Sequence, residues 1–433
     1  MNTAALNAAS TDFERLTYAK VALRIIPFMF FCYVLAYLDR VNVSFAKLQM
    51  LNDLQLSEAV YGLGAGIFFI GYFLFEVPSN LFLHRFGARR WIARIMITWG
   101  LVSAAMMFVT TPTMFYVLRF LLGIAEAGFF PGIILYLTYW FPSDRRGRMT
   151  AMFMTAIPIS GVLGSPLSGW IMETFAGLNG WAGWQWLFLL EGVPTALVGL
   201  VVLFYLDDDI AKAKWLTADE KSLLSANIAK DQQSASSHSF RGALGDIRVW
   251  VLSAVYFGVV MGLYGIGFWL PSLIKATGVQ HATHIGLLTA IPYAAATVCM
   301  IFVSRSADRY RERRIHFAIP CLLGAVGLVL STIYADNTTL ALVALSVACA
   351  GIMGGLPVFW SCPTAFLGGA AAAGGIALIN SLGNLAGFVS PYMVGFVKDM
   401  TQSTASGMYV LAACLVLSAI LIMAFVPART VNR

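Results

Sequence analysis

Four charged residues lie inside long apolar segments, where lipid hydrocarbon makes every charge costly. They are Asp39, Arg40, Arg119 and Glu126. An arginine keeps its charge at all working pH values, and its planar guanidinium matches a carboxylate. A carboxylate at the same depth can be ionised or protonated, so Asp39 and Glu126 are candidate proton carriers. These residue types predict a site that binds an organic anion and links its binding to protons.

Arg40 has neighbours that suit a binding site. At about 100° per residue, Tyr33, Tyr37 and Ser44 lie on the same helical face as Arg40, whereas Asp39 faces elsewhere. Such an aromatic and polar stripe is typical of a cavity wall. We therefore expect Arg40 and Tyr37 to contact the substrate.

Arg119 and Glu126 share a helical face about two turns apart, and we expect them to form an ion pair. In the alternative interpretation, this pair and Arg40 are static contacts that only hold helices together. Glu76 and Glu191 lie nearer the ends of apolar segments, which favours structural roles.

The second half of the chain carries no charged residue at comparable depth, but it carries polar aromatic and amide side chains. Tyr264, Trp360, Asn380 and Asn384 could donate hydrogen bonds to the far end of a substrate, and the two asparagines share a face. For each aromatic ring, packing at a membrane interface is the alternative.

The elements that position these residues must be membrane-spanning helices. The 433 residues are 59% hydrophobic and only 11% charged, with a mean hydropathy of +0.78. The apolar runs lack the alternation of a membrane β-barrel. We predict an all-α membrane protein with 12 transmembrane helices, near 22–45, 59–83, 91–110, 113–139, 149–172, 184–206, 249–273, 284–304, 315–335, 339–361, 371–397 and 405–427.

These spans divide the chain into two six-helix halves with a cavity where the halves meet. The predicted divisions are an N-terminal tail over 1–21, a first half over 22–206, a linker with a surface helix over 207–248, a second half over 249–427 and a tail over 428–433.

The basic residues predict the orientation, because Lys and Arg stay on the cytoplasmic side. With both termini inside, most of the 28 basic residues are cytoplasmic, and only Lys47, Lys275 and Lys398 fall in outer loops. The net charge of +7 therefore reflects topology, and we expect no nucleic-acid partner. The six cysteines show no metal-ligand spacing, and no nucleophile–base pair or cofactor loop is visible, so we expect neither metal, cofactor nor enzymatic activity.

The two halves also share a repeated loop. HRFGARR begins at His84, after the second predicted span, and DRYRERR begins at Asp308, after the eighth. Internal repeats of this kind are typical of secondary transporters, which move one half against the other around a site at mid-membrane.

Several strings resemble the major facilitator superfamily and, within it, the anion:cation symporters. They are YLDRVNVS, LHRFGARRW, LRFLLGIAEAGFFPG, FPSDRRGR, WQWLFLLEGVP, YGIGFWLPSLIK, GLLTAIPYAAA and AAAGGIALINSLGNLAGFVSPYMVG. The later strings are most similar to a bacterial branch that includes tartrate transporters, with relatives that handle phthalate, hydroxyphenylacetate and sugar acids.

The resemblance implies roles for individual residues. It assigns Arg40 to carboxylate binding, Asp39 and Glu126 to proton coupling, and Arg119 to pairing with Glu126. It places Tyr37, Tyr72, Trp360 and Asn380 on the cavity wall, and it implies gating loops that contain Arg85, Gly87, Arg89, Asp308 and Arg309. His84 stands where the superfamily has Asp, so the first loop lacks the carboxylate that makes the superfamily's gating contact.

Together these observations predict a proton-coupled importer of a small organic anion, tartrate or a related hydroxy dicarboxylate. We expect a monomer in the bacterial inner membrane whose partners are the anion, protons and the lipid bilayer. The alternatives are an importer of an aromatic acid or a sugar acid and, in another class, a membrane anion sensor.

Overall fold

The computed structural model describes residues 3–234, 245–366 and 369–432, and within these ranges every regular element is a helix. The first half contains α1 (Thr3–Val41), α2 (Val43–Asp53), α3 (Glu58–Phe86), α4 (Ala88–Ala105), η1 (Met106–Phe108), α5 (Pro112–Glu126), α6 (Phe129–Thr138), α7 (Ser143–Met154), α8 (Ala156–Thr174), η2 (Leu178–Gly180) and α9 (Gly183–Tyr205). After α10 (Ala218–Ser234), the second half contains α12 (Ile247–Ala276), α13 (Ala282–Tyr310), α14 (Arg314–Ile333), α15 (Thr338–Gly354), α16 (Leu356–Phe366), α17 (Gly369–Thr401), α18 (Ala405–Phe425) and α19 (Ala428–Val431).

The twelve predicted spans are confirmed. Eleven described segments are long and apolar enough to cross a membrane, and the 33-residue helix α17 is the twelfth. Four spans consist of two consecutive α-helices: α1 with α2, α5 with α6, α7 with α8, and α15 with α16. Many large apolar side chains of these spans remain exposed on the outside of the bundle, as lipid contact requires.

Helix starts follow from local capping chemistry. The Ser57 and Thr111 side chains accept hydrogen bonds from the backbone N–H groups of Val60 and Met114, three residues further along the chain. These oxygens satisfy N–H groups that have no partner within their own helix. Pro112 occupies the first turn of α5, where its missing N–H is harmless.

The fourth span is broken where the sequence predicted a continuous helix. Glu126 is the last residue of α5, Gly128 has a left-handed φ of 84°, and α6 begins at Phe129. A Cβ atom on Gly128 would lie 2.3 Å from the Ser79 hydroxyl oxygen, so both the backbone angle and the space require glycine. The break places the Glu126 carboxylate at a helix end inside the bundle.

The two halves meet mainly along two helix pairs, α3 with α17 and α8 with α13, with a smaller contact between α2 and α12. Gly62 of α3 lies so close to α17 that a Cβ would be 2.4 Å from the carbonyl oxygen of Pro391. Gly286 of α13 follows Gly62 at the same offset that separates the two repeated loops, and it has the same relationship to the carbonyl oxygen of Ser165 in α8, also at 2.4 Å. Small residues therefore allow close approach at two equivalent places.

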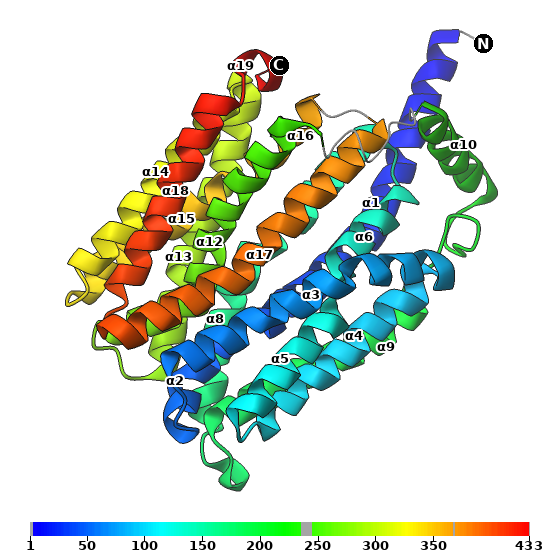
Figure 1. The fold of residues 1–433 in the computed structure, drawn as a ribbon. Helices are drawn as coiled ribbons and strands as arrows, with labels where there is room; N and C mark the ends of the chain where they lie inside the picture. Colours follow the sequence, from blue (N-terminus) through cyan, green and yellow to red (C-terminus); the bar gives the residue numbers. More distant parts are fainter. Residues whose placement is uncertain (1–2, 235–244, 367–368, 433) are drawn as a thin grey trace.

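Both chain ends and α10 lie at one end of the molecule, and α2 lies at the other (Figure 1). The surface helix predicted in the linker is α10, and Lys20 of α1 binds Glu220 of α10 at 2.8 Å. Residues 235–244 of the predicted linker lie outside the described residues. The segment predicted as an N-terminal tail is part of α1, because this helix begins at Thr3.

Candidate functional site

A cavity of about 50 Å³ lies between the two halves. The lining side chains come from both, and they are Tyr33, Tyr37, Arg40, Phe69, Tyr72, Phe130, Met154, Ile157, Tyr256, Leu263, Tyr264, Leu356, Trp360, Asn380 and Asn384. All seven residues predicted to contact the substrate are in this set: Arg40, Tyr37, Tyr72, Tyr264, Trp360, Asn380 and Asn384. The structure thus brings together side chains that the sequence places on five different spans.

Arg40 is the charged group of this cavity. It lies next to the end of α1, with only 6% of its surface exposed. Its Nε donates to Glu126 Oε1 at 3.1 Å, its Nη2 contacts the same oxygen, and its Nη1 donates to the Tyr264 hydroxyl at 3.1 Å. The rings of Tyr37 and Tyr72 lie 5.5 and 5.4 Å from the guanidinium carbon. The cation is therefore held by hydrogen bonds and by aromatic faces.

Glu126 is fully buried and uses one oxygen for Arg40, while Oε2 has no hydrogen-bond partner among the described side chains and backbone groups. The sequence predicted Arg119 as the ion-pair partner of Glu126. This prediction is wrong, because Glu126 forms its ion pair with Arg40 of another helix.

The geometry of α5 explains this correction. Seven residues advance a helix by about 10 Å, so Arg119 and Glu126 share a face but lie too far apart for direct contact. Arg119 instead donates from Nε to the carbonyl oxygen of Gly64 at 3.2 Å and from Nη2 to that of Ala65 at 3.1 Å. Arg119 therefore links α5 to α3 and does not line the cavity.

Asp39 faces away from the cavity, as its helical position predicted. Its two carboxylate oxygens accept hydrogen bonds from Trp99 Nε1 at 2.8 Å and from the Ser103 hydroxyl at 2.9 Å, both on α4. Ser44 of the predicted stripe also lies outside this cavity and lines a separate, smaller pocket.

Glu76 does not line the cavity, but it contacts the lining residue Asn380, and the sequence did not predict this contact. The Asn380 amide donates to Glu76 Oε1 at 3.3 Å, a contact between the two halves, and Glu76 Oε2 has no hydrogen-bond partner among the described groups. The sequence did contain an indication of this position: Glu76 follows Tyr72 by one helical turn and so lies on the same helical face. The apolar lining residues Phe69 and Phe130 could not be told from ordinary core residues.

The predicted gating loops occupy equivalent positions in the two halves. Gly87 adopts a φ of 88° between α3 and α4, and its counterpart in the second loop, Arg311, adopts a left-handed φ of 50° after α13. The Arg89 N–H donates to Asp208 Oδ1 at 3.0 Å. A carboxylate therefore contacts this loop, although His84 replaces the Asp expected within it. The side chains of Arg85 and Arg309 each lie over the ring of the following residue. Asp308 lies in the last turn of α13.

Comparison with known proteins gives matches over nearly the whole chain. The chain is 51% identical over 418 residues to the "Putative metabolite transport protein NicT" of Pseudomonas putida, covering 96% of this chain and 95% of the relative. It is 52% identical to a "Putative tartrate transporter" of Agrobacterium vitis, covering 95% and 92% of the two chains. A "Quinolone resistance transporter" of Acinetobacter baumannii is 42% identical, covering 95% of both chains.

Solved structures show the same fold. A D-xylose-proton symporter matches with a TM-score of 0.74 at 18% identity, over 95% of this chain and 99% of that one. A bacterial homolog of the human lysosomal transporter Spinster, in an inward-facing conformation, matches with a TM-score of 0.71 at 15% identity, over 96% and 98%. The sequence model described as "Major Facilitator Superfamily" matches residues 29–391. With twelve spans, a cavity between two halves and these relatives, the chain belongs to the major facilitator superfamily of membrane transporters.

Proposed function

We propose that this transporter imports a small hydroxy carboxylate such as tartrate together with protons. One observation carries the proposal: Arg40, which is paired with the buried Glu126, lines a cavity whose other polar lining groups are neutral hydrogen-bonding side chains. The name of the tartrate relative, at 52% identity, supports the substrate class.

Binding and protonation are linked through Arg40. The Nε and Nη2 groups that would form a two-point contact with a substrate carboxylate are directed at Glu126 in this structure. A substrate carboxylate that takes these donors removes the cation from a fully buried Glu126. A buried carboxylate without a cation favours its protonated form, so the arriving anion promotes proton uptake by Glu126.

The neutral wall suits hydroxyl groups. The polar lining groups of the second half include Asn380 and Asn384 of α17, Trp360 of α16 and Tyr264 of α12. Amide and phenol groups can each bond a substrate hydroxyl or a second carboxylate. The proposed setting is a monomer in the bacterial inner membrane with both termini in the cytoplasm, in accord with the basic residues of the inner loops.

An aromatic acid is the second candidate substrate, because eight of the fifteen lining residues are aromatic. Rings of this kind would stack on an aromatic substrate while Arg40 binds its carboxylate. Such a substrate would offer no hydrogen-bond partner to the Asn384 amide or to the carbonyl oxygen of the Asn380 amide, at a cost of about 1–3 kcal/mol for each polar group that it buries unsatisfied.

The experiment is uptake of labelled tartrate into proteoliposomes under an imposed inward proton gradient. Accumulation that a protonophore abolishes supports proton-coupled import, whereas binding without any uptake favours an anion sensor. Competition with a sugar acid, phthalate and hydroxyphenylacetate then tests the substrate class. If only the aromatic acids compete and are themselves accumulated, the hydroxy-acid proposal is wrong and the second candidate replaces it.

A further inference from the structure

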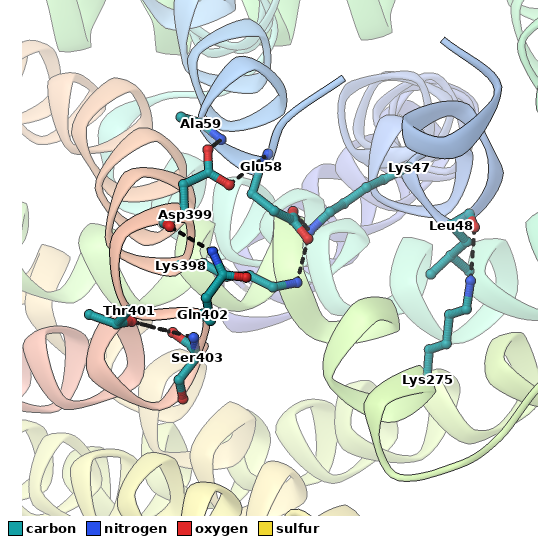
Figure 2. Close-up of polar contacts among 10 residues, drawn as sticks. All are labelled: Lys47, Leu48, Glu58, Ala59, Lys275, Lys398, Asp399, Thr401, Gln402 and Ser403. Atoms are coloured by element: carbon teal, nitrogen blue, oxygen red, sulfur yellow. Dashed lines mark hydrogen bonds and ion pairs between the residues drawn. The ribbon is translucent and has the colours of Figure 1, made fainter. Parts of the chain in front are cut away.

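Polar contacts join the two halves at the end of the molecule where α2 lies (Figure 2). Lys398 of α17 forms an ion pair with Glu58 of α3, which also binds Lys47 of α2 at 2.7 Å. The Lys47 ammonium lies 3.3 Å from the ring centroid of Trp269 in α12. Lys275 of α12 donates to a backbone carbonyl of α2 at 2.9 Å. The three lysines that the charge count places outside therefore all reach from one half to the other.

The first of two capping contacts at this end involves Asp399, near the end of α17. Its Oδ1 and Oδ2 accept hydrogen bonds from the backbone N–H groups of Glu58 at 3.2 Å and Ala59 at 2.8 Å (Figure 2). These are the first two residues of α3, whose N–H groups lack partners within the helix. A carboxylate is also favoured there by the helix dipole. A side chain of the second half thus caps a helix of the first half.

The second capping contact is the reverse. Glu173, near the end of α8, accepts a hydrogen bond from the backbone N–H of Thr283 at 2.9 Å, and its other oxygen lies 3.0 Å from His281 Nδ1. Thr283 is in the first turn of α13, so a side chain of the first half caps a helix of the second half.

The repeat relates these two contacts. Ala59 and Thr283 are separated by the same offset as the repeated loops, and Glu173 and Asp399 are separated by nearly the same offset. The helix pairs are the same ones whose glycines approach closely, α3 with α17 and α8 with α13. Each half therefore supplies one carboxylate to the other at equivalent positions.

We propose that these reciprocal caps, Asp399 on α3 and Glu173 on α13, form the outer gate of the transporter. The assignment to the outer side rests on the proposed function, because that proposal places both termini in the cytoplasm and this end outside the cell. A transporter that rocks its halves must separate them here to admit substrate. When the halves separate, the first N–H groups of α3 and α13 lose these hydrogen bonds and both carboxylates become hydrated. The capping contacts therefore stabilise the state in which the outer end is closed. The competing view is that α3–α17 and α8–α13 stay joined here throughout transport.

The test measures opening directly, with spin labels on the full-length protein in lipid nanodiscs. The native cysteines are replaced, and labels are attached at Asn52→Cys in the first half and Ala335→Cys in the second, both exposed near this end. Asp399→Asn and Glu173→Gln keep the side-chain shape but remove the charge. We expect each to raise the population with the longer label distance about twofold to fivefold, as expected for one carboxylate at a helix start. The double variant should show roughly the product.

The controls separate gating from misfolding. Asp12→Asn removes an acidic residue that pairs with Arg15 on an exposed part of α1, and it should leave the distances unchanged. Asp399→Glu keeps a carboxylate and should give a population close to that of the parent. Unchanged distances in a folded double variant overturn the proposal, and so does an equal shift in Asp12→Asn. No substrate enters this measurement, so a wrong substrate assignment does not affect its outcome.

Discussion

The Arg40 guanidinium donates a 3.1 Å hydrogen bond to the Tyr264 hydroxyl, and the two residues are separated by 224 positions, the offset of the internal repeat. Arg40 of the first half and Tyr264 of the second thus hold equivalent places in α1 and α12. The first-half position carries a cation, Arg40, and the equivalent second-half position carries a neutral hydroxyl, Tyr264, which can donate and accept a hydrogen bond. The cavity is therefore built from symmetric helices with asymmetric chemistry, which suits a substrate with a charged end and a hydroxylated end.

Replacing Arg40 with Lys keeps the positive charge but removes the planar fork. An ammonium lacks the fixed, coplanar spacing of Nε, Nη1 and Nη2, so we expect it to lose at least one of the contacts to Glu126 and Tyr264, and hydrogen bonds to charged groups contribute about 1.5–3 kcal/mol each. We expect the initial uptake rate in proteoliposomes to fall at least about tenfold with normal membrane insertion. Arg248→Lys, at the start of α12 and away from the cavity, is the matched control and should transport normally. A normal rate for Arg40→Lys would remove Arg40 from the binding site.

Glu126→Gln is a permanent mimic of the protonated form. If protonation of Glu126 couples the two fluxes, this variant should lose accumulation driven by the proton gradient, yet still exchange labelled for unlabelled substrate. Counterflow and gradient-driven uptake in the same vesicles give the two measurements. Glu220→Gln, on the surface helix α10, is the control. Full accumulation by Glu126→Gln would show that the coupling proton binds elsewhere, with Asp39 as the next candidate.

Asp39→Asn should change coupling without changing the affinity for substrate. The Asp39 carboxylate contacts Trp99 and Ser103 on α4 and does not line the cavity. We expect an apparent substrate affinity within about twofold of the parent and a lower accumulation ratio, since the proposed role is in proton coupling. Equilibrium binding and the pH profile of uptake check this. A large loss of binding would place Asp39 in the substrate site instead.

Arg119→Lys should lower stability more than it lowers transport. The Arg119 side chain bonds two carbonyl oxygens of α3 from Nε and Nη2, and a lysine lacks two donor nitrogens at this fixed spacing, so we expect it to lose one of the two bonds. Losing one buried hydrogen bond of this kind costs about 1–3 kcal/mol, so the melting temperature in detergent should fall. The ratio of protons to substrate should remain that of the parent. Loss of coupling at an unchanged melting temperature would restore the role that the sequence predicted for Arg119.

Asn380→Ala tests the hydroxyl-binding wall. The Asn380 amide lines the cavity and donates to Glu76, so its removal should weaken binding of a substrate that needs a polar partner there. We expect the apparent affinity for tartrate to fall about fivefold to 100-fold, as for one buried hydrogen bond. Succinate has the same carboxylates but no hydroxyls, and its competition should change much less. Equal losses for both acids would assign Asn380 to carboxylate binding or to structure.

The sequence by itself determined the spans, the division into halves and most of the polar residues of the cavity wall. Twelve spans follow from local hydropathy, because each must individually satisfy the thickness of the bilayer. Helical spacing placed Tyr37 beside Arg40 and Asn384 beside Asn380, and both pairs line the cavity. These features depend only on residues that are close in the chain, from about one helical turn apart to the length of one span.

Only the tertiary structure decided which charges pair. Glu126 meets Arg40 from a distant part of the chain, and the nearer Arg119 turns to the backbone of α3. The break at Gly128 and the contact of Asn380 with Glu76 were likewise hidden, because glycines also serve packing and a carboxylate near a span end also serves structure. A helical pattern fixes the face on which a side chain lies. Which helix meets that face depends on how distant segments pack, and spacing along the chain does not encode it.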